Sequence, residues 1–231
     1  MDNNLIDRKL LSSITNAFRY FSVITITGPR QSGKTTLCRK LFATLPYYNL
    51  EEPSTLAMIK NDPTAFLTKH DEGMIIDEAQ RFPDIFSYLQ VLVDEQQFAG
   101  EIRRKFIVTG SANFALMQHV SQSMAGRTAV LTLLPLSTQE IDLVSPETDT
   151  DMRILRGGYP AIWKIDDEGR NVLLSNYYTT YVERDLHSLI NIKDLSQFHS
   201  FIRLCAGRIG TEFVASSLAV EVGVSVPTIQ S

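Results

Sequence analysis

The sequence predicts an α/β fold, in which a parallel sheet forms the middle layer of a three-layer sandwich, followed by an all-α region. Between residues 22 and 133, short β-branched or aromatic runs alternate with helical patterns, and five strands fit into that stretch. After about residue 137 the strand signals stop and only helical patterns remain. With 231 residues, of which 44% are hydrophobic, the chain is long enough to bury a substantial core.

The spacing of apolar residues predicts the individual elements in order. Apolar positions at helical spacing predict an amphipathic helix over residues 5–20. The expected strands are residues 22–27, 47–50, 73–76, 105–109 and 128–133. Between the third and fourth strands, Pro83 and Asp84 open a helix with one apolar face, formed by Ile85, Phe86, Leu89, Leu92 and Val93.

A polar stretch separates the strands from the all-α region. Residues 145–151 are polar and predict a linker. Helical patterns then cover residues 172–189, 198–206 and 214–222. We therefore expect an α/β domain over residues 1–143 and a helical region over residues 151–231.

Composition and charge exclude several classes of protein. The formal net charge is −4 and neither half of the chain is net basic, so an autonomous nucleic-acid-binding domain is not expected. Cys38 and Cys205 lie far apart, which argues against a disulfide framework or a zinc site. The start of the chain is polar and every apolar run is short, so we expect no signal peptide and no membrane partner. These features predict a cytoplasmic location.

The strongest motif is a phosphate-binding loop after the first expected strand. Its pattern, G-x-x-x-x-G-K-[ST], is matched in full by Gly28, Pro29, Arg30, Gln31, Ser32, Gly33, Lys34 and Thr35, and Thr36 completes the predicted site. The glycines let the backbone approach phosphate oxygens, and the helix that follows adds the positive end of its dipole. Lys34 is expected to neutralise the β- and γ-phosphates, and the Thr35 hydroxyl to bind Mg²⁺.

Two adjacent acids, Asp77 and Glu78, end the third expected strand. At the carboxyl edge of a parallel sheet, Asp77 is expected to hold the Mg²⁺ shell and Glu78 to polarise the attacking water. A kinase that acts on a small molecule needs no such second acid. The pair therefore favours hydrolysis over transfer to another acceptor.

Two further positions carry candidate catalytic side chains. At the end of the fourth strand, a polar side chain can orient the lytic water or sense the γ-phosphate; Thr109 is the first choice, followed by Ser111 or Asn113, although the same residues favour a turn. Arg127 is either a finger that reaches the nucleotide of a neighbouring subunit or a surface arginine paired with a carboxylate. The sequence leaves both alternatives open.

Together these segments resemble a large prokaryotic family of AAA-type ATPases followed by a C-terminal domain of unknown function. The resemblance extends from about residue 20 to residue 231 and rests on residues 28–36, 49–53, 75–80, 109–113, 125–127, 156–160 and 181–185. It implies a P-loop NTPase core with strand order 5-1-4-3-2, ATP with Mg²⁺, and Glu78 as the catalytic carboxylate. The biological role is not implied by the match.

The last residues carry the pattern of a helix-turn-helix. Ala219, Gly223 and Ile229 have its offsets, while Ser225 and Pro227 suit the start of the second helix. In the resembling family a winged helix is usual here and the chain continues further. We therefore expect an incomplete C-terminal domain.

The sequence thus predicts a Mg-dependent AAA-type ATPase that couples its nucleotide state to the C-terminal helical module. The expected partners are ATP, further copies of the chain, and DNA or a protein bound through the C-terminal region. The alternative is a slow, nucleotide-gated switch that binds DNA or protein rather than an enzyme of rapid turnover. A small-molecule kinase is a weaker third hypothesis.

Overall fold

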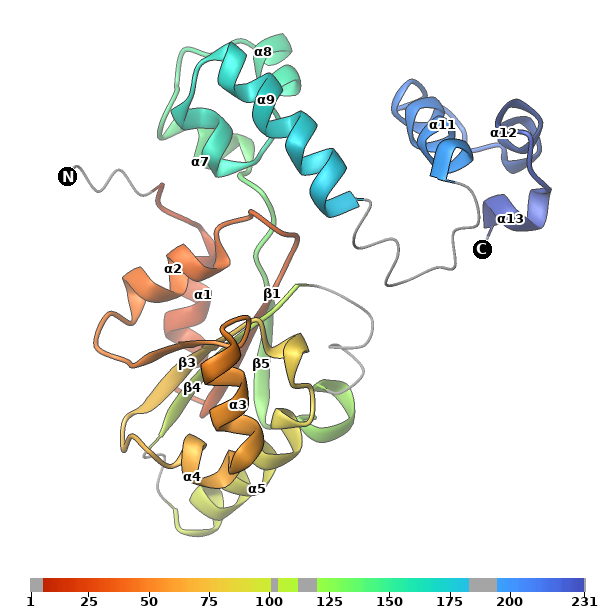
Figure 1. Ribbon diagram of the computed structural model, residues 1–231. Helices are drawn as coiled ribbons and strands as arrows, with labels where there is room; N and C mark the ends of the chain where they lie inside the picture. The colour runs from red at the N-terminus through yellow and green to blue at the C-terminus, as the bar shows by residue number, and fades with distance from the viewer. Residues whose placement is uncertain (1–5, 101–103, 112–119, 183–194, 231) are drawn as a thin grey trace. The chain divides into compact units, whose positions relative to one another are not determined.

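The computed structural model describes residues 6–100, 104–111, 120–182 and 195–230. The chain divides into two compact units, Met1–Arg170 and Asn171–Ser231, which we describe separately. The first unit contains a five-stranded sheet with helices on both faces, and the described part of the second consists of helices (Figure 1).

The sheet of the first unit is parallel, and the strand that precedes the phosphate loop lies inside it. Its order is β2-β3-β4-β1-β5, and every neighbouring pair is parallel. This confirms the expected order 5-1-4-3-2. The strands are β1 (Val23–Thr27), β2 (Tyr47–Asn49), β3 (Gly73–Asp77), β4 (Lys105–Thr109) and β5 (Thr128–Thr132), each within one residue of its predicted limits.

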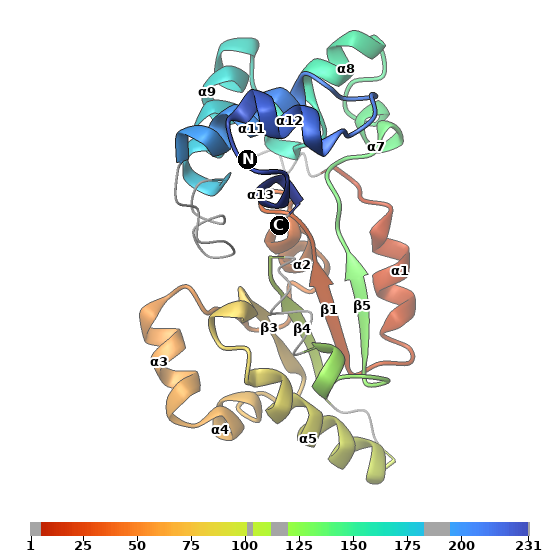
Figure 2. The same cartoon turned by 90° about the vertical axis from the view of Figure 1, so that its right-hand side faces the viewer.

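Helices cover both faces of the sheet and create two apolar cores (Figures 1 and 2). One face packs against α1 (Leu10–Ala17) and α2 (Lys34–Leu41). The other packs against α3 (Pro53–Asn61), α4 (Pro63–Leu67) and α5 (Ile85–Phe98). Because successive strand residues point to opposite faces, Ile75 joins the first core while Met74 and Ile76 join the second. Burial on both faces is typical of a parallel sheet.

The N-terminal helix is shorter than the predicted range of residues 5–20. It begins at Leu10 and ends at Ala17. Before it, Ile6 is buried with Leu136 and Ile141, which follow β5 in the chain. The Lys9 amide donates a hydrogen bond of 2.8 Å to a Glu140 carboxylate oxygen. These tertiary contacts hold the residues before Leu10 and outweigh their helical pattern.

The predicted linker, residues 145–151, includes the start of a helix. The elements after β5 are α7 (Thr138–Asp142), α8 (Thr150–Arg156), the 3₁₀-helix η2 (Pro160–Lys164) and α9 (Asp167–Tyr177). Asp149 caps α8 by accepting a hydrogen bond of 2.8 Å from the Met152 amide, which explains why a polar stretch is also a helix start. The predicted domain limits, 1–143 and 151–231, remain a prediction, since the two compact units divide within α9.

The second unit continues from α9 into a π-helical turn, η3 (Tyr178–Val182), and then contains α11 (Leu195–Ala206), α12 (Ala215–Val222) and α13 (Val226–Gln230). The predicted helix over residues 172–189 is described only as far as residue 182, and the rest lies outside the described residues. Gly223 ends α12 in the left-handed conformation, with φ of 77°. This is the glycine turn expected between the two helices of a helix-turn-helix.

The described segments contain no helix that is both long enough and apolar enough to cross a membrane.

The two ends of α5 provide a direct test of the packing. Phe86 is 0% exposed in the second core, whereas Phe98 at the end of the same helix is 97% exposed. We expect Phe86→Ala to lower the free energy of unfolding by about 3–5 kcal/mol, because it opens a cavity. The matched control Phe98→Ala should change it by less than about 0.5 kcal/mol. Urea denaturation of both variants measures the difference, and equal effects would contradict the observed face of α5.

Candidate active site

The parallel sheet brings the predicted site residues to one edge. The phosphate loop follows β1, Asp77 and Glu78 lie at the end of β3, and Thr109 is the last residue of β4. Because all strands run in the same direction, their carboxyl ends meet at the same edge of the sheet, where ligands bind in open α/β folds.

The phosphate loop has the curled backbone that anion binding requires. Three of its residues have positive φ: Gly28 (146°), Gln31 (60°) and Gly33 (96°). A Cβ atom at Gly28 would lie 2.2 Å from the Leu133 carbonyl oxygen, so only glycine fits where the loop leaves β1. α2 begins directly after Gly33, which places the positive end of its dipole at the loop.

Lys34 is buried and its ammonium group contacts the loop itself. Nζ donates hydrogen bonds to the carbonyl oxygens of Gly28 (3.0 Å) and Pro29 (2.9 Å). Burial lowers the pKa of Lys34, although Glu78 and Asp77 partly oppose this effect. Among the described residues, the direct acceptors of this buried cation are neutral, so it is suited to an anionic ligand, which would stabilise its charge.

Asp77 joins three elements through its carboxylate. Thr35 Oγ1 and Tyr47 Oη each donate a hydrogen bond of 2.7 Å to Oδ2. Thr109 Oγ1 donates to Oδ1, as does the Glu78 amide, at 3.1 Å. A carboxylate has about four acceptor positions, and four donors contact this one. The side chain, on a residue that is 2% exposed, therefore connects α2, β2 and β4.

Thr109, the first choice for a residue that orients the lytic water or senses the γ-phosphate, belongs to the hydrogen-bond network of Asp77. Its hydroxyl is buried and binds Asp77, so the described contact is with the carboxylate that is expected to hold Mg²⁺. Ser111 has a buried Oγ without a hydrogen-bond partner among the described residues. Asn113 lies outside the described residues. A role for any of them toward water or the γ-phosphate stays a prediction.

Glu78 has a backbone conformation that is rare for a side-chain-bearing residue. Its φ of 59° and ψ of 45° are left-handed, at a typical cost of about 1–2 kcal/mol. Its carboxylate accepts a hydrogen bond from Gln80 Nε2. Burial raises the pKa of Glu78, while the Gln80 hydrogen bond opposes this rise. Backbone strain of this kind gathers at functional sites, and the catalytic role of Glu78 stays a prediction.

Arg127 lies away from the loop. It precedes β5 and is therefore at the amino edge of the sheet, opposite the phosphate loop. Its Nε and Nη2 donate to the two carboxylate oxygens of Asp94 at 2.5 and 3.0 Å. This hydrogen-bonded pairing raises the pKa of Arg127 and lowers that of Asp94. Within the chain Arg127 is a paired surface arginine, and action at a neighbouring subunit's nucleotide stays a prediction.

Several residues of the site escape the sequence analysis. Tyr47 is recognised only as the start of a strand, although its hydroxyl binds Asp77. Arg8 binds the carbonyl oxygen of Ser32 in the phosphate loop, and Glu140 binds Arg8. A signal for Glu140 is present, because Ser137 and Glu140 have the spacing of a capping box. No such signal marks Arg8, which stands between Asp7 and Lys9 in the sequence.

The oxygen donors at this edge suit Mg²⁺ bound together with phosphates. Within the described segments, no cluster of three or more His, Cys, Asp or Glu residues could hold a metal by itself. Thr35 and Asp77 supply one hydroxyl and one carboxylate, side by side. Mg²⁺ is commonly held by one or two carboxylates, with waters and substrate phosphates completing its six ligands. The residues therefore fit this ion.

Comparison with known proteins supports the expected family. A family model described as an AAA domain matches residues 20–142, and one described as a domain of unknown function (DUF8612) matches residues 147–231. The uncharacterized protein Rv2008c of Mycobacterium tuberculosis is 33% identical over 189 residues, which are 80% of this chain and 41% of that protein. The uncharacterized protein Mb2031c of Mycobacterium bovis has the same values. The chain thus spans less than half the length of these curated relatives.

Solved structures show the same fold at low identity. The Walker-type ATPase PABY2304 of Pyrococcus abyssi is 13% identical, with a TM-score of 0.55 over 95% of this chain and 89% of its own. The signal transduction ATPase with numerous domains, PH0952, from Pyrococcus horikoshii is 20% identical, with a TM-score of 0.50 over 96% of this chain and 40% of its own. The sheet order, the phosphate loop and the AAA match over more than half of its residues show that this chain belongs to the AAA domain family of P-loop ATPases.

Proposed function

We propose that this chain binds Mg·ATP at the carboxyl edge of its sheet and hydrolyses it to ADP and phosphate. The observation that carries this proposal is the carboxylate of Asp77, which binds the hydroxyls of Thr35 and Thr109. This network joins the phosphate loop to the two strands beside which hydrolysis is expected. Glu78 follows directly in the chain, with a partly buried carboxylate.

Binding is assigned to the loop and to the first turn of α2. Backbone amides of the loop and the Lys34 ammonium bind the phosphates, and Thr35 with Asp77 holds the metal ion. When bound, Mg²⁺ neutralises charge on the β- and γ-phosphate oxygens. Pro29, Arg30, Gln31, Ser32 and Thr36 complete the proposed nucleotide site as parts of the same loop.

Catalysis is assigned to Glu78, which orients a water and accepts its proton as the water oxygen attacks the γ-phosphorus. The bond between this phosphorus and the bridging oxygen breaks, and ADP leaves. Burial raises the pKa of Glu78, which makes its carboxylate a better proton acceptor than an exposed one. The adjacent acids also favour hydrolysis over the small-molecule kinase considered above.

Two substitutions separate binding from turnover. We expect Lys34→Ala to abolish nucleotide binding, because it removes the only lysine of the loop. Glu78→Gln should keep binding and lower turnover by about 100-fold or more, because the amide cannot accept the proton. Fluorescence titration with a labelled ATP analogue and phosphate release measure the two steps.

The matched control for Glu78→Gln is Glu72→Gln, which changes an exposed glutamate just before the amino end of β3. This control should hydrolyse ATP like the wild type. Equal hydrolysis by wild type and Glu78→Gln would contradict the catalytic assignment.

The contact between Thr109 and Asp77 is tested through the metal requirement. Thr109→Val removes the hydroxyl at nearly constant volume, whereas Thr109→Ser keeps it. We expect the valine variant to need roughly tenfold more Mg²⁺ for half-maximal hydrolysis, because a partner of the metal-holding carboxylate is lost. The serine variant should stay near the wild type. The same Mg²⁺ dependence in all three proteins would show that Thr109 does not support Asp77.

A slow, nucleotide-gated switch is the second candidate, and the helix pair α12–α13 favours it. The pair is joined at Gly223, and Gln197 of α11 donates a hydrogen bond of 3.3 Å to the Gly223 carbonyl oxygen. Such helix pairs bind DNA in many proteins. Coupling of the nucleotide state to this module belongs to the proposal, as do a homo-oligomer and a cytoplasmic location.

Titration against a labelled DNA duplex, with and without ATP, tests the switch. If α13 binds DNA, the duplex should bind in a salt-sensitive way, with an affinity that changes on addition of ATP. Removal of residues 213–231 should abolish the binding. No salt-sensitive binding by the full chain would remove DNA as the partner and leave a protein partner.

A further inference from the structure

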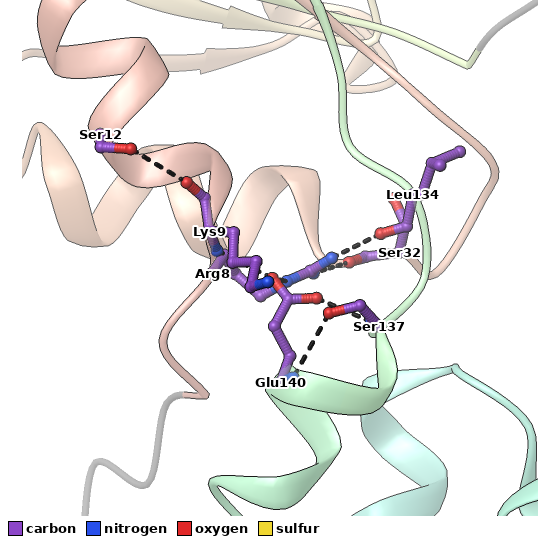
Figure 3. A network of polar contacts seen from close by, with 7 residues as sticks. All are labelled: Arg8, Lys9, Ser12, Ser32, Leu134, Ser137 and Glu140. Atoms are coloured by element: carbon purple, nitrogen blue, oxygen red, sulfur yellow. Dashed lines mark hydrogen bonds and ion pairs between the residues drawn. The ribbon is translucent and has the colours of Figure 1, made fainter.

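Arg8 connects three distant parts of the chain at the phosphate loop (Figure 3). Its residue is 8% exposed and lies just before α1. Nη1 donates a hydrogen bond of 2.7 Å to the Ser32 carbonyl oxygen within the phosphate loop. Nη2 donates to the Leu134 carbonyl oxygen, and Nε donates to Glu140 at 3.0 Å. All three guanidinium nitrogens therefore have acceptors within the chain.

Glu140 is built to hold Arg8 in place. Its Oε1 accepts hydrogen bonds from Arg8 Nε and from the Lys9 amide, at 3.0 and 2.8 Å. Its Oε2 accepts from the Ser137 amide at 2.8 Å, as part of the capping box of α7. Burial alone would raise the pKa of Glu140, but the hydrogen bonds from Ser137, Lys9 and Arg8 outweigh burial and lower it. The ion pair thus has a fixed anchor on α7.

The contact with Ser32 determines which way one peptide of the loop faces. The described chain has no cis peptide bonds, so the Ser32 carbonyl and the Gly33 amide point in opposite directions. Since the carbonyl points to Arg8, the amide N–H points to the other side of the loop. Rotation of this peptide changes ψ of Ser32 and φ of Gly33. Glycine tolerates either orientation, so sterics alone do not set it.

We propose that Arg8 is a positioning residue for nucleotide binding, which holds the Ser32–Gly33 peptide with its N–H directed at the bound phosphates. This inference rests on the proposed function. Arg8 acts through the peptide, because its own nitrogens are already engaged. Glu140 keeps the guanidinium in place, so the loop is tied to α7.

The orientation of the peptide can be tested without any nucleotide. In full-length protein labelled with ¹⁵N-glycine, we expect Arg8→Gln to move the Gly33 amide resonance. The control Arg19→Gln removes an exposed arginine and should leave that resonance in place. The double variant Arg8→Gln/Glu140→Gln removes both buried charges, and it keeps the test valid if the single variant does not fold.

Nucleotide binding provides the second measurement, with ADP as the probe. Arg8→Gln and Arg8→Lys should weaken ADP binding by about tenfold or more, since lysine lacks the fork that reaches two carbonyl oxygens and Glu140. Arg19→Gln should bind ADP like the wild type. Millimolar methylguanidinium should restore part of the affinity of Arg8→Ala, which a general loss of folding would not allow.

The outcomes separate this inference from the proposed function. Folded Arg8 variants with an unchanged Gly33 resonance and wild-type ADP affinity would overturn the role of Arg8. A wild type that binds no ADP would overturn the proposed function. In that case a moved Gly33 resonance would still support control of the peptide by Arg8, and an unmoved one would refute it.

Discussion

The site depends on one buried carboxylate. Asp77 has four hydrogen-bond donors, from the first turn of α2, from β2, from β4 and from the next amide in the chain. Such a group is costly to bury unless its acceptors are satisfied, so the three elements must meet where they do. The parallel sheet makes this possible for Thr109, since it places the carboxyl ends of β3 and β4 side by side. Tyr47 reaches Asp77 with its hydroxyl from the first residue of β2. Fold and site are therefore parts of one arrangement.

A second group of polar side chains contacts the phosphate loop at the Ser32 carbonyl oxygen. Arg8 and Glu140 form a buried ion pair between the residues before α1 and the helix after β5. Buried ion pairs add little net stability, because desolvation offsets their attraction. They can instead favour one conformation over others. Here Arg8 fixes the positions of the Ser32 and Leu134 carbonyl oxygens relative to each other. The same pair explains why the first helix begins late.

Membership of the AAA domain family and the sheet order place the proposed nucleotide site at the carboxyl edge of a P-loop fold. The left-handed backbone of Glu78 and the buried ammonium of Lys34 support that proposal. Arg127 does not belong to this site within the chain, because its ion pair with Asp94 lies at the opposite edge of the sheet. A contribution of Arg127 to catalysis would require that it reach the nucleotide of a neighbouring subunit.

The sequence by itself determined the strands and, through the family resemblance, their order. It also predicted a site formed by residues 28–36, 77 and 78. These are local patterns, in which period, glycine position and adjacent acids carry the information. The roles of Tyr47, Arg8 and Glu140 were decided by the tertiary structure, since each contacts a partner at least 24 residues away. The start of α1 also depends on a contact between distant residues, because the Lys9 amide donates a hydrogen bond to Glu140. Contacts between distant segments leave no periodic trace in the sequence, and only the folded chain shows which donors reach which acceptors.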